Sequence, residues 1–283
     1  MKLNEFFTPR KKLTEGGSMP GVGAIHISEI EPTLGYLEKL LHIDLKNNVL
    51  GSVGKKEFSG DIDVAISIPP EEMPAFIEKL DALPEILDMA KSSVIMTKVK
   101  IAGYDPSKET DKPRTGFVQL DFMPGDPGWM KTYYHSPSES ESKYKGVFRN
   151  VLLNEIAANY DSSSSGEEIA DGRPTKVTRF MFSPAKGLIK IARTPAKNKA
   201  GTGYTKANND AVIDGPWQAP EEIVRVLDLG DIGSLNSYES LKAAIEKNYP
   251  RELVDQILTR FANSPIVKDI GVPDDIKHLV GAI

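Results

Sequence analysis

The chain has 283 residues, 40% of them hydrophobic and 27% charged, which is typical of a soluble globular protein with one sizeable core or two smaller ones. Its formal net charge of −5 argues against a protein that coats nucleic acid over its whole surface. The absence of cysteine excludes disulfides, thiolate nucleophiles and Cys-zinc sites. No apolar run approaches the ~20 residues needed to cross a bilayer. We therefore expect a cytoplasmic protein without a membrane partner.

The first elements are an irregular lead-in and a helix. Residues 1–28 are rich in Gly, Pro and Lys without a sustained period, which indicates an N-terminal arm. Residues 32–46 carry five leucines at helical spacing and predict an amphipathic helix. A short strand is expected at 48–50, directly before a Gly-Ser pair.

Strand patterns dominate the next part of the chain. Residues 61–68 form a β-rich run that ends at two prolines, and residues 94–101 and 116–122 are two further strand candidates. A polar loop at 105–114 separates these two. Between the first and second strands, apolar residues recur at helical intervals over 71–90, which predicts a helix or a pair of helical turns.

The second half of the chain favours helices. One helix is predicted over 144–160, and Pro, Gly and Ser separate three more at 220–227, 237–247 and 251–261. The Asp-Ser-Ser-Ser-Ser-Gly segment at 161–166 has the composition of a linker. The whole pattern predicts an α+β protein: a small mixed sheet with flanking helices, followed by a mainly helical C-terminal region.

The loop that starts at residue 51 has the composition of a phosphate-binding loop. Gly51 and Ser52 are small enough for backbone N–H groups and a hydroxyl to approach phosphate oxygens closely. Lys55 or Lys56 could then help to neutralise a bound polyanion. Gly51 and Ser52 taken alone indicate a simple turn, so a phosphate-binding role requires support from residues later in the chain.

Three carboxylates come after this loop in a strand context. Asp61 and Asp63 are two residues apart, so a strand places both on one face while Ile62 faces the core. Asp121 lies in a later strand candidate with the same alternation. If the two strands are neighbours, the three carboxylates form a site for Mg²⁺ or Mn²⁺, since hard divalent cations prefer carboxylate, phosphate and water oxygens.

A solvated strand face would be the commoner explanation of Asp61 and Asp63 alone. The phosphate-type loop upstream and Asp121 downstream reverse that preference in favour of a metal site.

These residues resemble the polymerase β-like nucleotidyltransferase superfamily. The shared pattern is Gly-Ser, about ten residues, Asp-x-Asp and a later Asp on a neighbouring strand. The resemblance covers roughly residues 34–160. It is closest to the family X DNA polymerases, because a Tyr-Tyr-His-Ser-Pro segment falls where those enzymes have a Tyr-Phe-x-Gly-Ser turn.

The resemblance implies a role for each matching residue. Asp61, Asp63 and Asp121 would bind metal and carry catalysis. The nucleotide-binding residues would be Gly51, Ser52, Lys55, Lys56, Tyr133, Tyr134 and Arg149, with the tyrosines near sugar and base. For Arg149 taken alone, a position on the helix surface is the commoner reading.

A basic stretch covers residues 172–209, which contain no Asp or Glu. It suits a polyanionic partner such as RNA, although a solvated positive face explains it equally well. The candidate polyanion-binding residues are Arg173, Lys176, Arg179, Lys186, Lys190 and Arg193.

The expected reaction is transfer of a nucleoside monophosphate from a triphosphate such as ATP to an acceptor hydroxyl, with release of pyrophosphate. The acceptor is expected to be an RNA or tRNA 3′ end. Two alternatives remain open: nucleotidylation of a small molecule or a protein, and a non-catalytic nucleic-acid-binding or assembly protein on the same fold. The expected organisation is an arm at 1–30, a nucleotidyltransferase domain at 31–160, and a basic segment with a helical domain at 161–283.

Overall fold

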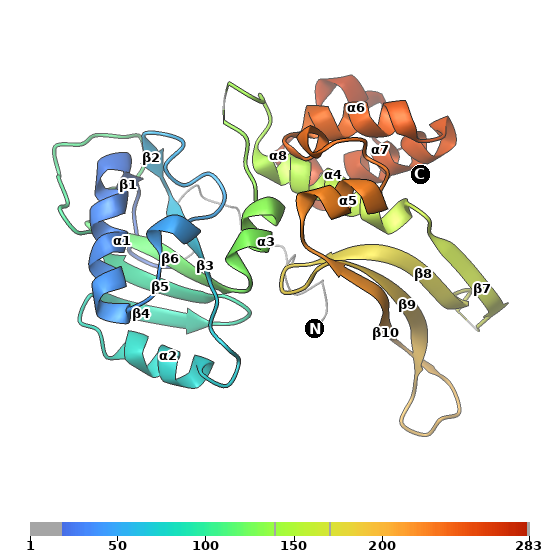
Figure 1. Ribbon diagram of the computed structural model, residues 1–283, viewed down its shortest axis with the longest axis horizontal. Coiled ribbons are helices and arrows are strands. Elements are labelled where there is room, and N and C mark those ends of the chain that lie inside the picture. Colours follow the sequence, from blue (N-terminus) through green and yellow to red (C-terminus); the bar gives the residue numbers. More distant parts are fainter. Residues whose placement is uncertain (1–18, 139, 170, 282–283) are drawn as a thin grey trace. The chain divides into compact units, whose positions relative to one another are not determined.

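The computed structural model describes residues 19–138, 140–169 and 171–281. The chain divides into two compact units, with the boundary between Lys131 and Thr132 (Figure 1). Both units mix helices with a four-stranded sheet, so the fold is α+β. Within the described ranges, no helix is both long and apolar enough to cross a membrane.

The first unit is built on a mixed four-stranded sheet of order β3-β6-β5-β4. Strand β3 pairs parallel with β6, whereas the β6–β5 and β5–β4 pairs are antiparallel. A two-stranded ribbon, β1-β2, accompanies it. The elements of this part are β1 (Ile25–His26), α1 (Ile27–Leu41), η2 (Lys46–Asn48), β2 (Phe58–Ser59), β3 (Asp61–Ile66), α2 (Met73–Asp81), β4 (Ile86–Lys91), β5 (Ile95–Lys100) and β6 (Phe117–Pro124). Helix α3 (Pro127–Tyr133) contains the boundary between the units.

The core of this unit lies between the sheet and helices α1 and α2. Alternate residues of β3 and β6 point into it, and Ile62, Val64, Leu120 and Phe122 are completely buried. The leucines of α1 and Leu80 of α2 belong to the same apolar cluster. Because side chains alternate along a strand, the carboxylates of β3 and β6 stand on the opposite face of the sheet.

Two features near the N-terminus differ from the sequence prediction. Helix α1 begins at Ile27 because His26 caps it and the Glu29 carboxylate accepts from the His26 backbone N–H, which forms a capping box. Pro32 therefore lies inside the helix. The sequence prediction, which begins at residue 32, places this proline at the helix start. The strand predicted at 48–50 is the 3₁₀ helix η2 followed by one isolated bridge, Val49 to Val64.

The helix predicted over 71–90 is correct only in its first part. Helix α2 ends at Asp81, and the next segment becomes strand β4. Pro84 has no N–H to donate and disfavours a helical residue before it. Pairing with β5 then determines the conformation of this segment, so Ile86 is buried in a strand instead of a helix.

The second unit combines helices with an antiparallel sheet of order β10-β9-β8-β7. Helix α4 packs on strand β8 and on helices α6 and α7. The elements are α4 (Gly146–Asn159), β7 (Ser163–Glu168), β8 (Pro174–Ser183), β9 (Gly187–Lys197), β10 (Tyr204–Trp217), α5 (Pro220–Val226), η3 (Ile232–Leu235), α6 (Tyr238–Asn248), α7 (Arg251–Asn263), α8 (Pro265–Ile270) and η4 (Asp274–Leu279).

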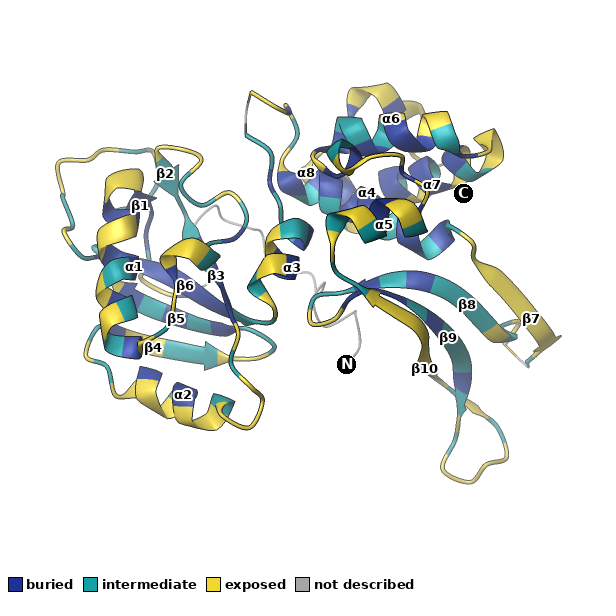
Figure 2. Cartoon of the chain, in the orientation of Figure 1, coloured by how far each residue is buried: buried dark blue, intermediate teal, exposed yellow. Residues whose placement is uncertain are grey.

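The sheet of the second unit is the main departure from the sequence prediction. The basic segment at 172–209 contains β8, β9 and the first part of β10, where the sequence predicted a basic stretch and then helices. Much of the predicted linker at 161–166 lies in β7. Both edge strands, β7 and β10, are almost entirely exposed (Figure 2). Their sequences carry little apolar alternation because they are edge strands with little buried surface, so strand periodicity gave no signal.

Candidate active site

The parallel pairing of β3 with β6 brings the predicted carboxylates onto adjacent strands. Asp63 is the direct partner of Asp121, and Asp61 is the partner of Gln119. Paired residues of adjacent strands point to the same side of a sheet and are about 4.8 Å apart at their Cα atoms. The structure therefore places Asp61, Asp63 and Asp121 on one face, as the sequence alternation required.

Exposure differs among the three carboxylates. Asp61 and Asp63 are half-buried. Asp121 is only 8% exposed, so its surroundings constrain its rotamer strongly. A polar side chain in such a position needs hydrogen bonds, because an unsatisfied buried carboxylate is costly.

Gln119 provides a pair of those hydrogen bonds. Its Nε2 donates to Oδ1 of Asp121 at 2.8 Å and to Oδ2 at 3.1 Å. Its Oε1 accepts from the backbone N–H of Met19 at 3.0 Å, and this hydrogen bond determines the orientation of the Gln119 side-chain amide. The contact with Met19 thus orients Gln119, and Gln119 orients Asp121.

Sequence reasoning did not identify Gln119 as part of the site. Its position two residues before Asp121 on the same strand was the available signal, because that spacing places both on one face. Lys98 pairs with Gln119 across β5 and β6, and its Nζ donates to the Pro20 carbonyl at 3.3 Å. The segment at 19–23 therefore runs across this face of the sheet.

The loop after Leu50 lies beside the carboxylates. The Leu50 N–H donates to the Asp63 carbonyl at 2.8 Å, which ties the start of the loop to β3. Gly51 has a φ of +67°, and a Cβ atom placed on it would lie 3.9 Å from Oδ2 of Asp63. Glycine adopts this conformation without the steric cost that other residues incur.

Backbone donors at the start of this loop support an anion-binding role. Within the described residues, the N–H groups of Gly51, Ser52 and Val53 donate to no acceptor. Successive N–H groups of this kind form concave sites for phosphate oxygens. The side chains of Ser52, Lys55 and Lys56 are exposed at the same loop. Gly51, the first of the predicted phosphate-binding residues, is thus close in space to Asp63.

The donor atoms of this face suit Mg²⁺ in kind, since carboxylate oxygens are the protein ligands it prefers. No three His, Cys, Asp or Glu side chains in the described part of the chain are close enough together to hold a metal ion. Asp61, Asp63 and Asp121 would therefore have to gather around an ion as it binds.

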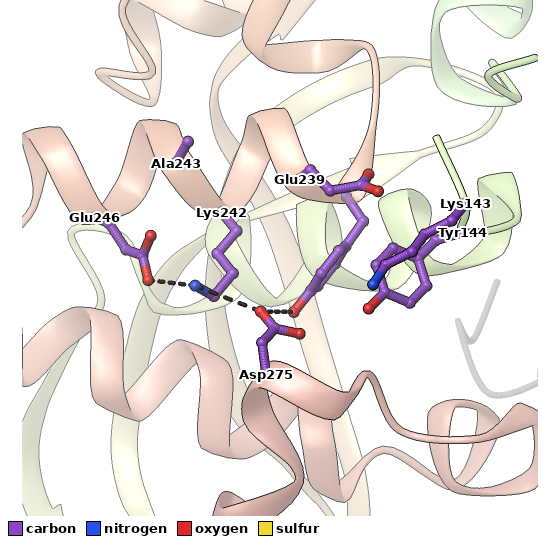
Figure 3. Close-up of a pocket in the computed structure, with 8 residues that line it drawn as sticks. Lys143, Tyr144, Glu239, Lys242, Ala243, Glu246 and Asp275 are labelled. Atoms are coloured by element: carbon purple, nitrogen blue, oxygen red, sulfur yellow. Dashed lines mark hydrogen bonds and ion pairs between the residues drawn. The ribbon is translucent and has the colours of Figure 1, made fainter. Parts of the chain in front are cut away.

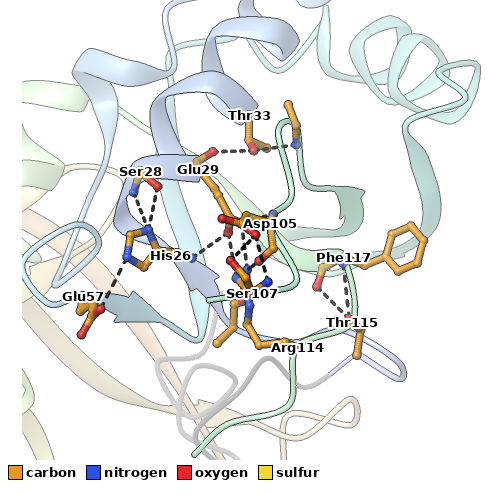
Figure 4. A network of polar contacts seen from close by, with 12 residues as sticks. His26, Ser28, Glu29, Thr33, Glu57, Asp105, Ser107, Arg114, Thr115 and Phe117 are labelled. Carbon is orange, nitrogen blue, oxygen red and sulfur yellow. Dashed lines mark hydrogen bonds and ion pairs between the residues drawn. The ribbon is translucent and has the colours of Figure 1, made fainter. Parts of the chain in front are cut away.

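A buried ion pair fastens the segments that lead into both strands (Figure 4). Arg114 donates to Oε1 and Oε2 of Glu29, each at 2.8 Å, and also to the carbonyl oxygens of Ala24 and Asp105. Its guanidinium stacks over the rings of Tyr104 and Phe58, the latter in strand β2 just before β3. The pair therefore joins the start of α1 to the chain before β3 and before β6.

The pKa of Glu29 is lowered in this network. Burial by itself raises the pKa, but the hydrogen bonds from Arg114 and from the backbone N–H groups of Asp105 and His26 outweigh burial. Hydrogen bonding to Glu29 in turn raises the pKa of Arg114. Both groups are charged at neutral pH, and the pair is part of the support behind the carboxylate face.

Three predicted nucleotide-binding residues lie in the second unit, and two of them have structural roles there. Arg149 is 1% exposed, so it is not on the helix surface. It donates to the carbonyl oxygens of Thr132, Tyr133 and Leu235 and to Oδ1 of Asn150. Because its donors serve protein oxygens, we leave Arg149 out of the proposed nucleotide site. Burial lowers its pKa to about 10, so it keeps its charge at neutral pH.

Tyr133 is also enclosed within the second unit. Its hydroxyl accepts from Nδ2 of Asn154 at 3.1 Å, and its ring packs on those of Tyr134 and Phe182. Burial raises the pKa of Tyr133. Tyr133 is therefore a core residue of its unit. Tyr134 remains half-buried, and its predicted role stays a prediction.

The structure separates the predicted polyanion-binding residues into paired and unpaired groups. Ion pairs engage three of them: Arg173 with Asp171, Lys190 with Asp161 at 2.6 Å, and Arg193 with Asp210 at 2.7 Å. Within the described ranges, no ion pair engages the other three, Lys176, Arg179 and Lys186.

A separate cavity of about 220 Å³ lies in the second unit (Figure 3). Lys242 lies between Glu246 and Asp275 at its wall, and Tyr238 donates to Asp275. These charged groups satisfy one another, and the wall contains no residue that the sequence marked for function.

No family model matches this chain, and no curated protein matches it. Among solved structures, it is similar to Leishmania infantum polymerase beta in a ternary P/T complex, at 15% identity and a TM-score of 0.40, over 72% of this chain and 73% of that one. A ternary gap complex of the same polymerase matches at 15% identity and a TM-score of 0.36, over 59% of this chain and 51% of that one. Similarity this low supports no conclusion about activity, so the assignment of a function depends on the chain's own residues.

Proposed function

We propose that this protein is a metal-dependent nucleotidyltransferase of the polymerase β-like type. The observation that carries the proposal is the in-register parallel pairing of Asp63 with Asp121, with Asp61 on the same face and Gly51 against the Asp63 carboxylate. Phosphoryl-transfer catalysis consists mostly of positioning and charge stabilisation, and this arrangement offers both.

Each group has a definite task in this reaction. Asp61, Asp63 and Asp121 would hold Mg²⁺ or Mn²⁺, which when bound neutralises charge on the triphosphate and polarises its oxygens. The loop N–H groups at Gly51 and Ser52, together with Lys55 or Lys56, would bind triphosphate oxygens.

The acceptor hydroxyl oxygen forms a bond to the α-phosphorus, and the bond from that phosphorus to the bridging oxygen of the leaving group breaks. Pyrophosphate leaves with the bonding electrons, and the hydroxyl proton passes to Asp121 or to a water that Asp121 orients. Each carboxylate oxygen has two lone pairs, so the Gln119 hydrogen bonds leave Asp121 capacity to accept that proton.

An RNA or tRNA 3′ end is the acceptor that we propose. The support is the basic sheet of the second unit, which offers cations to a partner larger than one triphosphate. A small molecule or a protein hydroxyl is the alternative acceptor, and a label-transfer assay separates the three.

The test is transfer of label from α-labelled NTPs and dNTPs to RNA, DNA, protein and small-molecule hydroxyl acceptors, with Mg²⁺ or Mn²⁺. Wild type is compared with Asp61→Ala, with Asp63→Asn and with the matched control Asp88→Asn, which changes an exposed carboxylate on β4 of the same sheet. Transfer that disappears in the first two variants and survives in the third supports the proposal and names the acceptor. No transfer by any of the proteins under either metal would overturn it.

A further inference from the structure

One face of the second sheet brings together arginines from three elements. Arg193 of β9 pairs with Val177 of β8, and Arg179 of β8 pairs with Ile191 of β9. Arg179 and Arg193 are therefore diagonal neighbours on the same face, within reach of each other's long side chains. Arg260 of α7 is close enough to Arg179 to affect its ionisation.

Arg179 is desolvated without a compensating partner. Its Nε is buried and has no hydrogen-bond partner. Among the described residues, no ion pair joins Arg179 or Arg260 to a carboxylate. The Nε–H of Arg179 is a donor, so its burial without an acceptor is costly unless a ligand completes the site.

The acidic groups near these arginines do not cancel their charge. Asp210 is engaged by Arg193 in a fork, with two contacts of 2.7 Å. Glu155 of α4 is the other nearby carboxylate, and burial raises its pKa. Three guanidinium groups thus face two carboxylates, which leaves a net positive charge on this face.

The same face continues towards the free end of the β9–β10 hairpin. Lys197 lies four residues after Arg193 on β9, so both point to the same side. Its direct partner on β10 is Tyr204, an exposed aromatic. Figure 1 shows the β9–β10 hairpin extending beyond the helices of this unit. Cations along one face of a sheet together with an exposed aromatic ring suit a nucleic-acid strand, because phosphates meet the cations and a base can stack on the ring.

We infer that Arg179 and Arg260, beside the Arg193–Asp210 ion pair, bind phosphodiester groups of a nucleic-acid strand that runs along β9 towards Lys197 and Tyr204. Arg260, far from the basic segment in sequence, joins the site only through the fold. This inference goes beyond the proposed catalysis, because binding at these arginines requires neither a metal ion nor a nucleoside triphosphate.

The experiment measures binding of a short fluorescein-labelled single-stranded oligonucleotide by anisotropy, with RNA and DNA in separate series and no divalent metal. Arg260→Gln is the first variant, since an exposed side chain can be changed without unfolding the protein. Arg179→Gln is the second. Arg251→Gln is the matched control, because Arg251 is a 92% exposed arginine of the same helix.

We expect Arg260→Gln and Arg179→Gln each to weaken binding about tenfold and to lower the salt slope by about one counterion. The control should bind as wild type does. Glu155→Gln should tighten binding, because it removes a nearby acidic group. Wild-type affinity in both arginine variants would overturn the inference. It would also be overturned if polyglutamate displaced the labelled oligonucleotide as well as unlabelled oligonucleotide does at an equal concentration of negative charges.

The same measurements in an Asp61→Ala background separate this inference from the proposed reaction. Binding that depends on the arginines and persists in that background supports the site whether or not the protein transfers nucleotides. Loss of binding in Asp61→Ala alone would contradict it.

Discussion

Replacing Arg114 by Met should destabilise the first unit far more than the loss of an ordinary ion pair. The side chains of Arg114 and Glu29 are 9% and 3% exposed. The variant keeps most of the apolar volume but leaves Glu29 with only backbone donors, and it removes the donor to the Ala24 and Asp105 carbonyls. Breaking one side of a buried pair costs about 3–5 kcal/mol.

Lys46→Met provides the matched control, because Lys46 pairs with Glu38 at 3.3 Å in a partly exposed position. Such pairs contribute about 0–1 kcal/mol. Hydrogen exchange of peptides from β3 and β6 gives the local free energy of opening and avoids assuming that both units unfold together. If Arg114→Met and Lys46→Met lower that free energy equally, the reasoning about the buried pair is refuted.

The pH dependence gives an independent check. Glu29 has a lowered pKa in the folded protein, so its contribution to stability is present above the unfolded pKa of about 4.3 and is lost as pH falls through the folded value. Arg114→Met removes the Arg114 hydrogen bond and charge, two of the causes that lower the pKa of Glu29, so the variant depends less on pH in this range. The gap in stability between wild type and Arg114→Met should therefore narrow below about pH 4.3. A gap that stays constant down to acid unfolding would contradict this assignment.

Three further predictions concern the two units. Gln119→Leu should raise the Mg²⁺ concentration for half-maximal transfer about tenfold, because it removes both amide hydrogen bonds that orient Asp121. An unchanged Mg²⁺ concentration for half-maximal transfer would exclude Gln119 from the site. Gly51→Ala and Gly103→Ala should each lower the free energy of unfolding by roughly 1–2 kcal/mol in thermal unfolding, since both glycines have positive φ. Gly103→Ala is the control, because only Gly51→Ala should raise the KM for NTP. Burial raises the pKa of Glu155, so the wild-type protein loses stability as the pH rises from the pKa of Glu155 in the unfolded chain to its pKa in the folded protein. Glu155→Gln should abolish that loss, which urea titrations at several pH values measure.

The carboxylate face could be predicted from the sequence because it depends on strand periodicity. Apolar residues alternate with Asp61, Asp63 and Asp121, and burial on one face results directly from that alternation. The sequence could not establish that the two strands are neighbours, since strand order depends on packing across the whole sheet. The register of Asp63 with Asp121 answers that question.

Other elements could not be predicted because long-range contacts override local preference. Helical spacing around Leu83 and Ile86 continued past the end of α2, but pairing with β5 makes that segment β4. In the second unit, β7 and β10 are edge strands with exposed side chains, so neither shows the alternation that identifies a strand.

Burial explains the errors and omissions among the candidate site residues. A sequence does not distinguish an arginine that reaches a ligand from one whose donors bind protein carbonyl groups, and Arg149 is of the second kind. Gln119 was overlooked for the opposite reason, because a neutral amide gives no signal of chemistry until its partner Asp121 is seen.

The parallel pairing of β3 with β6 also affects when the site can form during folding. Strands β4, β5 and β6 are consecutive and antiparallel, joined by residues 92–94 and by the longer segment 101–116. Pairing of β3 with β6 closes a loop that contains α2, β4 and β5, and such non-local pairing is slow because loop closure costs entropy before contacts form. A nascent or partly unfolded chain can therefore have most of the first sheet in place without bringing Asp61 and Asp63 beside Asp121, so the carboxylate face exists only in the completed domain.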